Sequence, residues 1–147
     1  MRFFHTLLFM FVGNFFAQYY FMSAVMSDSL TNITNNYGKM YLSIIMGLFM
    51  ILLEIGMHDS TYHVVNYKYY GIFGGLLVLF IYLYREQVAI QDKQYLEEMI
   101  EHHSMALLTS KKILEKTNNY YVSKLAKEII QKQEDEIKIM KNLVKKI

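Results

Sequence analysis

The hydrophobic pattern of the chain changes at Arg85: long, almost uncharged runs precede it, and charged residues alternate with apolar ones after it. Three apolar runs lie before this point, at about residues 3–26, 40–57 and 69–84. A helix needs about 20 apolar residues to cross the hydrocarbon core of a bilayer, with some latitude for tilt and aromatic flanks. Residues 1–84 are therefore predicted to form a transmembrane region of three helices in a multi-pass integral membrane protein.

After Arg85, apolar positions recur at the three-and-four spacing of amphipathic helices. A first set comprises Leu96, Met99, His103, Leu107 and Leu114, and a second comprises Val122, Ala126, Ile129, Gln133, Ile137, Met140, Val144 and Ile147. The polar residues 117–119 between the two sets indicate a turn. Residues 85–147 are therefore predicted to form an extramembrane antiparallel helical hairpin. In this hairpin His103 faces Gln133.

The connection between the third span and the hairpin contains no helix breaker. No Pro or Gly lies between Leu77 and Thr117. Since Pro and Gly are the residues that most strongly interrupt helices, the third span and the first hairpin helix are predicted to be continuous or nearly so. At 1.5 Å per residue, His103 would then stand about 27 Å beyond Arg85.

The position of the hairpin relative to the membrane follows from the number of spans. Basic residues flank the spans on both sides, so their distribution does not fix the orientation. Three crossings place the loop after the first span and the hairpin on the same side. The sequon at residues 32–34 favours an exterior or lumenal position for that loop, and hence for the hairpin.

Charge and cysteine content exclude several classes of function. From Arg85 onward, 12 basic residues stand against 10 acidic ones, a net charge of +2. This balance lacks the basic excess of nucleic-acid-binding domains, so we do not expect a nucleic-acid partner. The absence of Cys excludes disulfides, thiolate zinc sites and cysteine nucleophiles. Any bound metal must use nitrogen, oxygen or thioether ligands.

Candidate metal ligands gather at the predicted seam between the two hairpin helices. Residues three and four apart share one face of a helix. The candidate ligands are Met99, His102 and His103 on the first helix and Gln133, Glu136 and Met140 on the second, with the two histidines as principal ligands. Helix bundles build internal metal sites in this way. Imidazole suits copper and thioether selects Cu(I), whereas zinc gains little from Met, so the pattern favours copper and leaves zinc as the lesser alternative.

A structural interpretation of the same residues remains open. Met commonly fills irregular cores, and a His at a helix seam is more often a hydrogen-bonded core residue than a ligand. Two adjacent histidines are harder to place in a core, because both rings must find polar partners or lose solvation. Spacing alone does not decide between the two interpretations.

The second span carries a further polar pattern. Met46, Met50 and Glu54 stand four residues apart in turn, with Met57 and His58 close to the end of the span. An ionisable residue within a membrane helix is a functional candidate by default. The structural alternative is that Glu54 is protonated or is hydrogen-bonded to the first span, where Asn14 and His5 are candidate partners, and that the methionines only pack.

The stretch YLEEMIEHHSMALLTSKKILEK, followed by LAKEIIQKQEDEIKIM, resembles the domain of unknown function 305 family. The family pattern is Met-Ile-Pro-His-His with a small residue three positions on, then Ile-Ile-x-x-Gln-x-x-Glu-Ile-x-x-Met. It maps onto Met99, Ile100, His102, His103 and Ala106, then Ile129, Ile130, Gln133, Glu136, Ile137 and Met140, with Glu101 at the family's Pro. The spans before the motif are similar to the membrane-anchored branch of the family. The resemblance implies a ferritin-like helical fold and, for some exported members, copper binding through Met and His residues.

Two hypotheses follow from these observations. The first is a membrane-anchored metal-binding module, with copper favoured. The alternative is a structural or assembly protein of an organelle, envelope or virion membrane, whose hairpin mediates oligomer contacts without metal. An enzyme is not favoured, because the chain lacks the repeated Glu-x-x-His pairs of di-iron bundles.

A homo-oligomer, a dimer or higher, is expected under both hypotheses. A single hairpin buries one seam, whereas a ferritin-like bundle needs about four helices. The apolar positions outside the predicted seam, which we expect to form the contact between copies, are Ile100, Leu108, Ile113, Ile130 and Leu143.

Overall fold

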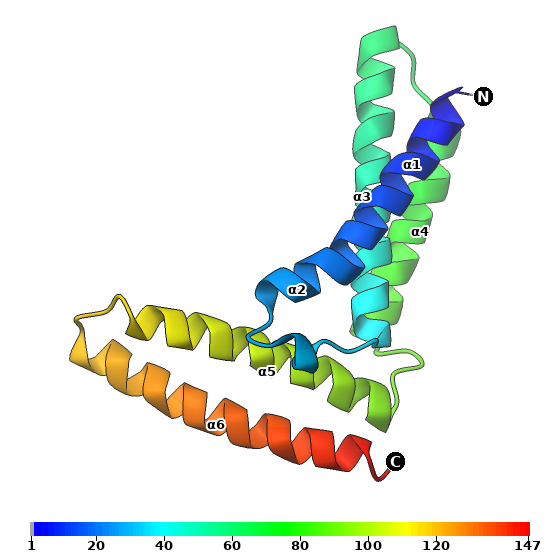
Figure 1. The fold of residues 1–147 in the computed structure, drawn as a ribbon. Helices are drawn as coiled ribbons and strands as arrows, with labels where there is room; N and C mark the ends of the chain where they lie inside the picture. Colours follow the sequence, from blue (N-terminus) through cyan, green and yellow to red (C-terminus); the bar gives the residue numbers. More distant parts are fainter. Residues whose placement is uncertain (1) are drawn as a thin grey trace. The chain divides into compact units, whose positions relative to one another are not determined.

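The protein is all-helical, as the sequence pattern predicts. The computed structural model describes residues 2–147, and this range contains helices and no strand (Figure 1). The elements are α1 (Arg2–Phe16), the π-helical η1 (Ala17–Phe21), α2 (Met22–Met26), the 3-10 turn η2 (Leu30–Asn32), α3 (Tyr37–Tyr62), α4 (Tyr67–Arg85), α5 (Asp92–Leu114) and α6 (Tyr120–Val144).

Three helical stretches are long and apolar enough to cross a membrane. They are Phe3–Met26, Tyr37–Tyr62 and Tyr67–Arg85. Each contains one of the stretches predicted from hydropathy, so the prediction of three membrane-length helices is confirmed.

The chain forms two compact units. The first unit combines the chain up to Phe21 with Gly38–Ala89, and the second combines Met22–Tyr37 with Ile90–Ile147. The polar loop that follows the first predicted span therefore clusters with the C-terminal helices, a grouping that the hydropathy pattern alone does not indicate.

The first unit has a small apolar core built by α1, α3 and α4. Leu7, Leu48, Ile51 and Ile55 are buried at its centre, and aromatic residues of α1 and α4 pack against them. A Cβ atom at Gly47 would lie 2.7 Å from the Phe11 ring. Glycine therefore permits the close approach of α1 and α3 at this point.

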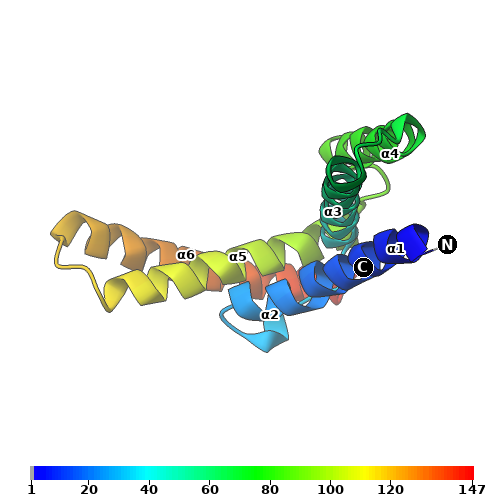
Figure 2. The same ribbon diagram turned by 90° about the horizontal axis from the view of Figure 1, so that it is seen from above.

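The core of the second unit lies between α5 and α6, which run side by side in opposite directions (Figures 1 and 2). Its buried centre comprises Ile100, Leu107, Ile137 and Met140, with Leu96, Met99, Ile130 and Val144 packed around it. The prediction that Ile100 and Ile130 lie outside the seam is wrong, because both pack in this core. On α5 the seam runs through Leu96, Ile100 and Leu107, so contacts within a single chain already bury Ile100.

The start of α6 is capped by the side chain of the residue that precedes it. Asn119 precedes α6, and its side-chain oxygen accepts hydrogen bonds from the backbone N–H groups of Tyr121 (2.9 Å) and Val122 (3.2 Å). An Asn at this position satisfies two of the free N–H groups of the first turn. The predicted turn at residues 117–119 is therefore confirmed.

The predicted continuity between the third span and α5 is wrong. α4 ends at Arg85 and α5 begins at Asp92. Between them, Gln87 and Ala89 adopt left-handed backbone conformations, with φ of 52° and 60°. The Tyr41 hydroxyl donates to the Val88 carbonyl oxygen at 2.9 Å and holds this turn. A helix can thus end without Gly or Pro, and the distance of about 27 Å expected for an unbroken helix no longer applies.

Candidate metal site

The six candidate ligands lie on the two facing helices of the second unit. Met99, His102 and His103 are on α5, and Gln133, Glu136 and Met140 are on α6. α5 begins with Asp92 in its first turn and carries Lys111 and Lys112 in its last. These charges complement the helix dipole, so the local sequence favours the helix that presents the histidines.

His103 is the best-defined member of the site. Its side chain is 15% exposed, and its Nδ1 donates a hydrogen bond to the Met99 carbonyl oxygen at 2.7 Å. Its Nε2 lies 2.9 Å from the Glu136 carboxylate on the facing helix. A backbone bond at Nδ1 is the usual way to fix the tautomer that presents Nε2 to a metal ion. In the structure the Glu136 carboxylate occupies the position in front of Nε2.

His102 points to a different partner. Its side chain is 48% exposed, and Nε2 lies 3.6 Å from the nearly buried carboxylate of Glu98, one turn earlier on α5. The Glu98 carboxylate raises the pKa of His102, through its contact with the imidazole and then its charge, against the opposing effect of partial burial. The adjacent histidines therefore form two separate acid–base pairs.

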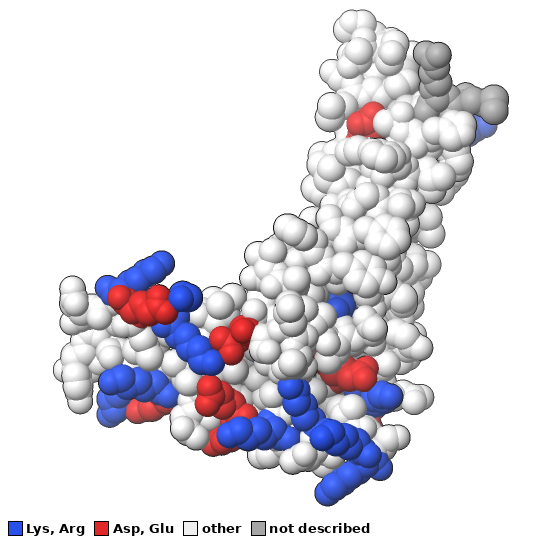
Figure 3. All heavy atoms as spheres, viewed as in Figure 1, with Lys and Arg blue, Asp and Glu red and all other residues white. Residues whose placement is uncertain are grey.

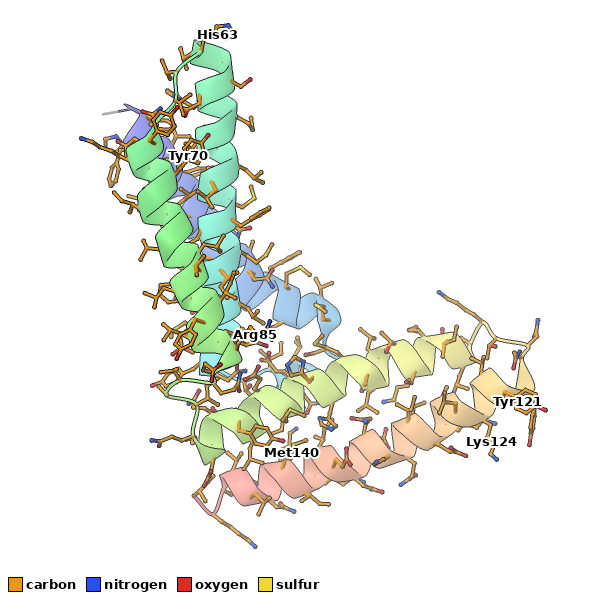
Figure 4. All side chains as sticks on the ribbon, turned by 180° about the vertical axis from the view of Figure 1, so that it is seen from behind. His63, Tyr70, Arg85, Tyr121, Lys124 and Met140 are labelled. Carbon is orange, nitrogen blue, oxygen red and sulfur yellow. The ribbon has the colours of Figure 1, made fainter. Side chains whose placement is uncertain are left out.

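The two thioether side chains lie within the apolar core. Met140 is 8% exposed and lies on the side of α6 that faces α5 (Figure 4). Met99 packs against the same core, and Gln133 is half-buried one turn before Glu136. These positions match a packing role for both methionines.

The structure brings together fewer ligands than the sequence pattern suggests. In residues 2–147 no group of three or more His, Asp or Glu side chains is placed to hold a metal ion. The direct contact across the helices is the pair of His103 and Glu136. Adjacent residues on a helix differ by about 100° in direction, which separates His102 from this pair.

Sequence reasoning missed the residues that fasten the polar loop to α5. We call residues 27–37 the docked loop. Glu101, at the position of the family's Pro, accepts a hydrogen bond from the Thr34 backbone N–H at 2.5 Å. Ser104 is fully buried, and its hydroxyl oxygen accepts from the Asp28 backbone N–H at 3.0 Å and from Asn32 at 3.1 Å. The sequence offered one signal of this contact, the acidic Glu101 directly before the histidine pair, because Glu is rarely buried without partners.

Charged residues complete the attachment of the docked loop. Lys111 on α5 pairs with Asp28 at 2.9 Å and with Glu134 of α6 at 3.4 Å, and the bond to Asp28 is the main cause that raises the pKa of Lys111. Lys141 of α6 donates to the Asn32 side-chain oxygen at 2.5 Å. The loop therefore bridges both helices of the pair.

These bonds also occupy the predicted glycosylation acceptor. Asn32 is 6% exposed, and its side-chain nitrogen donates to Ser104. A glycan is attached through that nitrogen, so the folded protein does not present the sequon as an acceptor. The sequon therefore does not support an exterior or lumenal position for the helix pair.

Comparison with known proteins places the chain in a family. The model of the family described as a domain of unknown function (DUF305) matches residues 82–144. A protein of Acanthamoeba polyphaga mimivirus, described as uncharacterized protein L153, is 30% identical over 145 residues, which cover 94% of this chain and 90% of the viral protein. The chain belongs to the DUF305 family. No solved structure matches it.

The two comparisons cover different parts of the protein. The DUF305 match begins near the end of α4 and extends to the end of α6, so it contains the histidine pair and all six candidate ligands. The likeness to the mimivirus protein extends over nearly the whole chain, including the three membrane-length helices. The resemblance drawn from the His-His motif is thus confirmed at the level of the family.

Proposed function

We propose that this DUF305 protein is a membrane-anchored helical module that binds a metal ion on its α5–α6 hairpin, with copper preferred over zinc. The observation that carries the proposal is His103, whose Nδ1 is bonded to a backbone carbonyl oxygen while Nε2 meets the Glu136 carboxylate from the facing helix. A metal ion and a proton compete for the same Nε2 position.

The surrounding residues allow the pair to open for an ion. The Glu136 side chain is 38% exposed, so it can move away from His103 without disturbing the core. In the structure His102 is directed to Glu98 and is more exposed than His103, so its part in the proposed site requires a change of rotamer. The proposal keeps Met99 and Met140, which pack in the core between α5 and α6, as secondary ligands because thioethers favour Cu(I).

The membrane arrangement of the proposal uses three crossings followed by an extramembrane hairpin. The docked loop and α5 are joined by the bonds of Thr34 and Asn32, which require both segments to lie on one side of the bilayer. Three crossings provide this arrangement.

A metal titration tests the proposal. The purified full chain is titrated with Cu(I), and separately with Zn(II), against a chromophoric competitor, and compared with the His102→Ala, His103→Ala double variant. We expect the double variant to bind copper at least tenfold more weakly. The matched control is His63→Ala, which alters an exposed histidine in the loop between α3 and α4. Equal affinity of wild type and double variant would contradict the proposal.

The second candidate function is structural or assembly protein, and the same residues favour it. His103 is satisfied within the chain without any metal, since both ring nitrogens have partners. Under this function the double alanine variant loses assembly, and its metal content equals that of wild type.

Either function is served by a homo-oligomer built from the hairpin. Leu125, Ile139 and Leu143 remain exposed on α6 in the single chain, at 58%, 58% and 43%. Two copies joined through this face give the four helices of a ferritin-like bundle. Ile139→Asp with Leu143→Asp is expected to give monomers by mass measurement in detergent, whereas Lys138→Asp is the control that keeps the oligomer.

A further inference from the structure

The first unit carries an unusual acidic residue. Acidic side chains in the three membrane-length helices are Glu54 and Asp59, both on α3. Figure 3 shows an isolated acidic patch on the nearly uncharged surface of this unit, in contrast to the mixed charges of the second unit. Glu54 is half-buried, and within the described part of the chain its carboxylate has no hydrogen bond or ion pair. The described residues therefore do not contain the hydrogen bond between Glu54 and the first span that the structural alternative expects.

Glu54 lines a groove that holds other metal-binding side chains. The groove has a volume of about 430 Å³, and its polar lining comprises Glu54, His58, Thr6 and Thr61, with the Met57 thioether beside them. Glu54 and His58 are four residues apart and Met57 lies three residues after Glu54, so α3 presents all three on neighbouring turns. A carboxylate, an imidazole and a thioether thus share one concave surface.

The imidazole of His58 is held in the orientation that a metal ligand requires. Its Nδ1 lies 3.2 Å from the carboxylate of Asp59, which is 6% exposed and also accepts the Asn66 backbone N–H at 2.7 Å. Because an ionised carboxylate only accepts, Nδ1 donates to Asp59, and in the neutral imidazole this leaves the lone pair on Nε2. The ring is packed between Phe3 at 3.9 Å and Tyr62 at 4.7 Å. A carboxylate that orients a histidine is the common outer partner of metal-ligating imidazoles.

We propose that the groove lined by Glu54, Met57 and His58 binds a copper ion, at a site independent of the hairpin histidines. A bound cation would offset the cost of an ionised carboxylate in an apolar helix. Imidazole suits copper, and the thioether favours Cu(I) over zinc. One chain supplies three donors, so water or a second chain completes the coordination.

The experiment uses the full-length His102→Ala, His103→Ala protein, in which the hairpin site is absent. The protein is purified, loaded with Cu(I) under ascorbate, washed, and assayed for copper per chain by elemental analysis. We expect one copper per chain in this background. Adding Glu54→Gln or His58→Gln should remove it or weaken Cu(I) binding at least tenfold in a competition assay.

Matched controls separate the groove from general effects. His63→Gln and Glu86→Gln change a histidine and a glutamate outside the groove, and both should leave the copper content unchanged. Circular dichroism confirms that each variant keeps its helix content, and Met57→Leu provides a third groove variant that preserves packing. The proposal is overturned if the double alanine background binds no copper, or if the groove variants retain as much copper as the two controls. Failure of the hairpin site alone would appear instead as equal copper content in wild type and the double alanine protein.

Discussion

At the scale of single residues, the pairing of His102 with Glu98 makes the helix pair sensitive to pH. The pKa of His102 is raised in the folded protein by Glu98. A group whose folded pKa is raised stabilises the fold below its unfolded pKa, about 6.5, and this contribution is lost as pH rises through the folded pKa. We predict that Glu98→Gln lowers the free energy of unfolding below about pH 6.5 and has a smaller effect at higher pH. Chemical denaturation at several pH values measures this difference, and a constant difference across pH would contradict it.

Ser104 carries the attachment of the docked loop. Its buried hydroxyl oxygen accepts two hydrogen bonds, from Asp28 and Asn32. Ser104→Ala leaves both donors without this partner and is expected to lower the free energy of unfolding by about 1–3 kcal/mol. The control is Thr109→Ala, because the Thr109 hydroxyl is exposed and bonds only to carbonyl oxygens of its own helix. Equal loss in both variants, measured by thermal or denaturant unfolding in detergent, would show that the loop contact contributes nothing.

The sequence predicted the position of some, but not all, side chains of the candidate site. The facing of His103 toward α6 follows from helix periodicity, and the structure pairs it with Glu136, one turn beyond the predicted partner Gln133. His102 is directed away from this pair by the turn of about 100° between adjacent helical residues, and it meets the Glu98 carboxylate one turn earlier on α5. Spacing places both histidines near the seam, but it does not decide which of several nearby carboxylates each ring contacts.

At the scale of elements, the turn between α4 and α5 depends on two residues with positive φ. Ala89 has φ of 60°, a conformation that costs an L-residue roughly 1–2 kcal/mol. Ala89→Gly is therefore expected to raise the free energy of unfolding by about 1 kcal/mol. The larger conformational entropy that Gly gives the unfolded chain offsets part of this gain. The matched Ala106→Gly change within α5 should lower the free energy of unfolding by about 1 kcal/mol. Chemical denaturation of both variants measures whether each change raises or lowers the free energy of unfolding. A decrease for Ala89→Gly as large as that for Ala106→Gly would refute a left-handed turn at Ala89.

The helices themselves were predictable because hydropathy and three-and-four periodicity are strong local signals. The end of α4 was not, because Gln87 and Ala89 are residues that the α-helix normally accepts. Their left-handed geometry depends on contacts such as the Tyr41 hydroxyl bond to Val88, 47 positions away in the sequence. The seam was misassigned at Ile100 for a related reason: the rotation of α5 about its axis is set by packing against α6.

At the scale of the whole molecule, three crossings predict which segments share a side of the membrane. The chain has no Cys, so single cysteines can report position without background labelling. Asp28→Cys and Lys116→Cys are expected to react with a membrane-impermeant thiol reagent from the same side of sealed vesicles. His63→Cys, in the loop at the opposite end of α3, is expected to react from the other side (Figure 4). Labelling of all three positions from one side would contradict the three-span arrangement.

The most direct test of the hairpin metal site is an anomalous difference map, recorded at the copper absorption edge from crystals of the full chain loaded with copper. We predict a peak between His103 Nε2 and the Glu136 carboxylate, with the 2.9 Å contact between these groups replaced by bonds to the ion. The Nδ1 bond to the Met99 carbonyl oxygen should persist, because it fixes the tautomer that leaves Nε2 free. A copper-loaded crystal with no peak at this position, and with His103 still bonded directly to Glu136, would contradict the proposal that the hairpin binds metal.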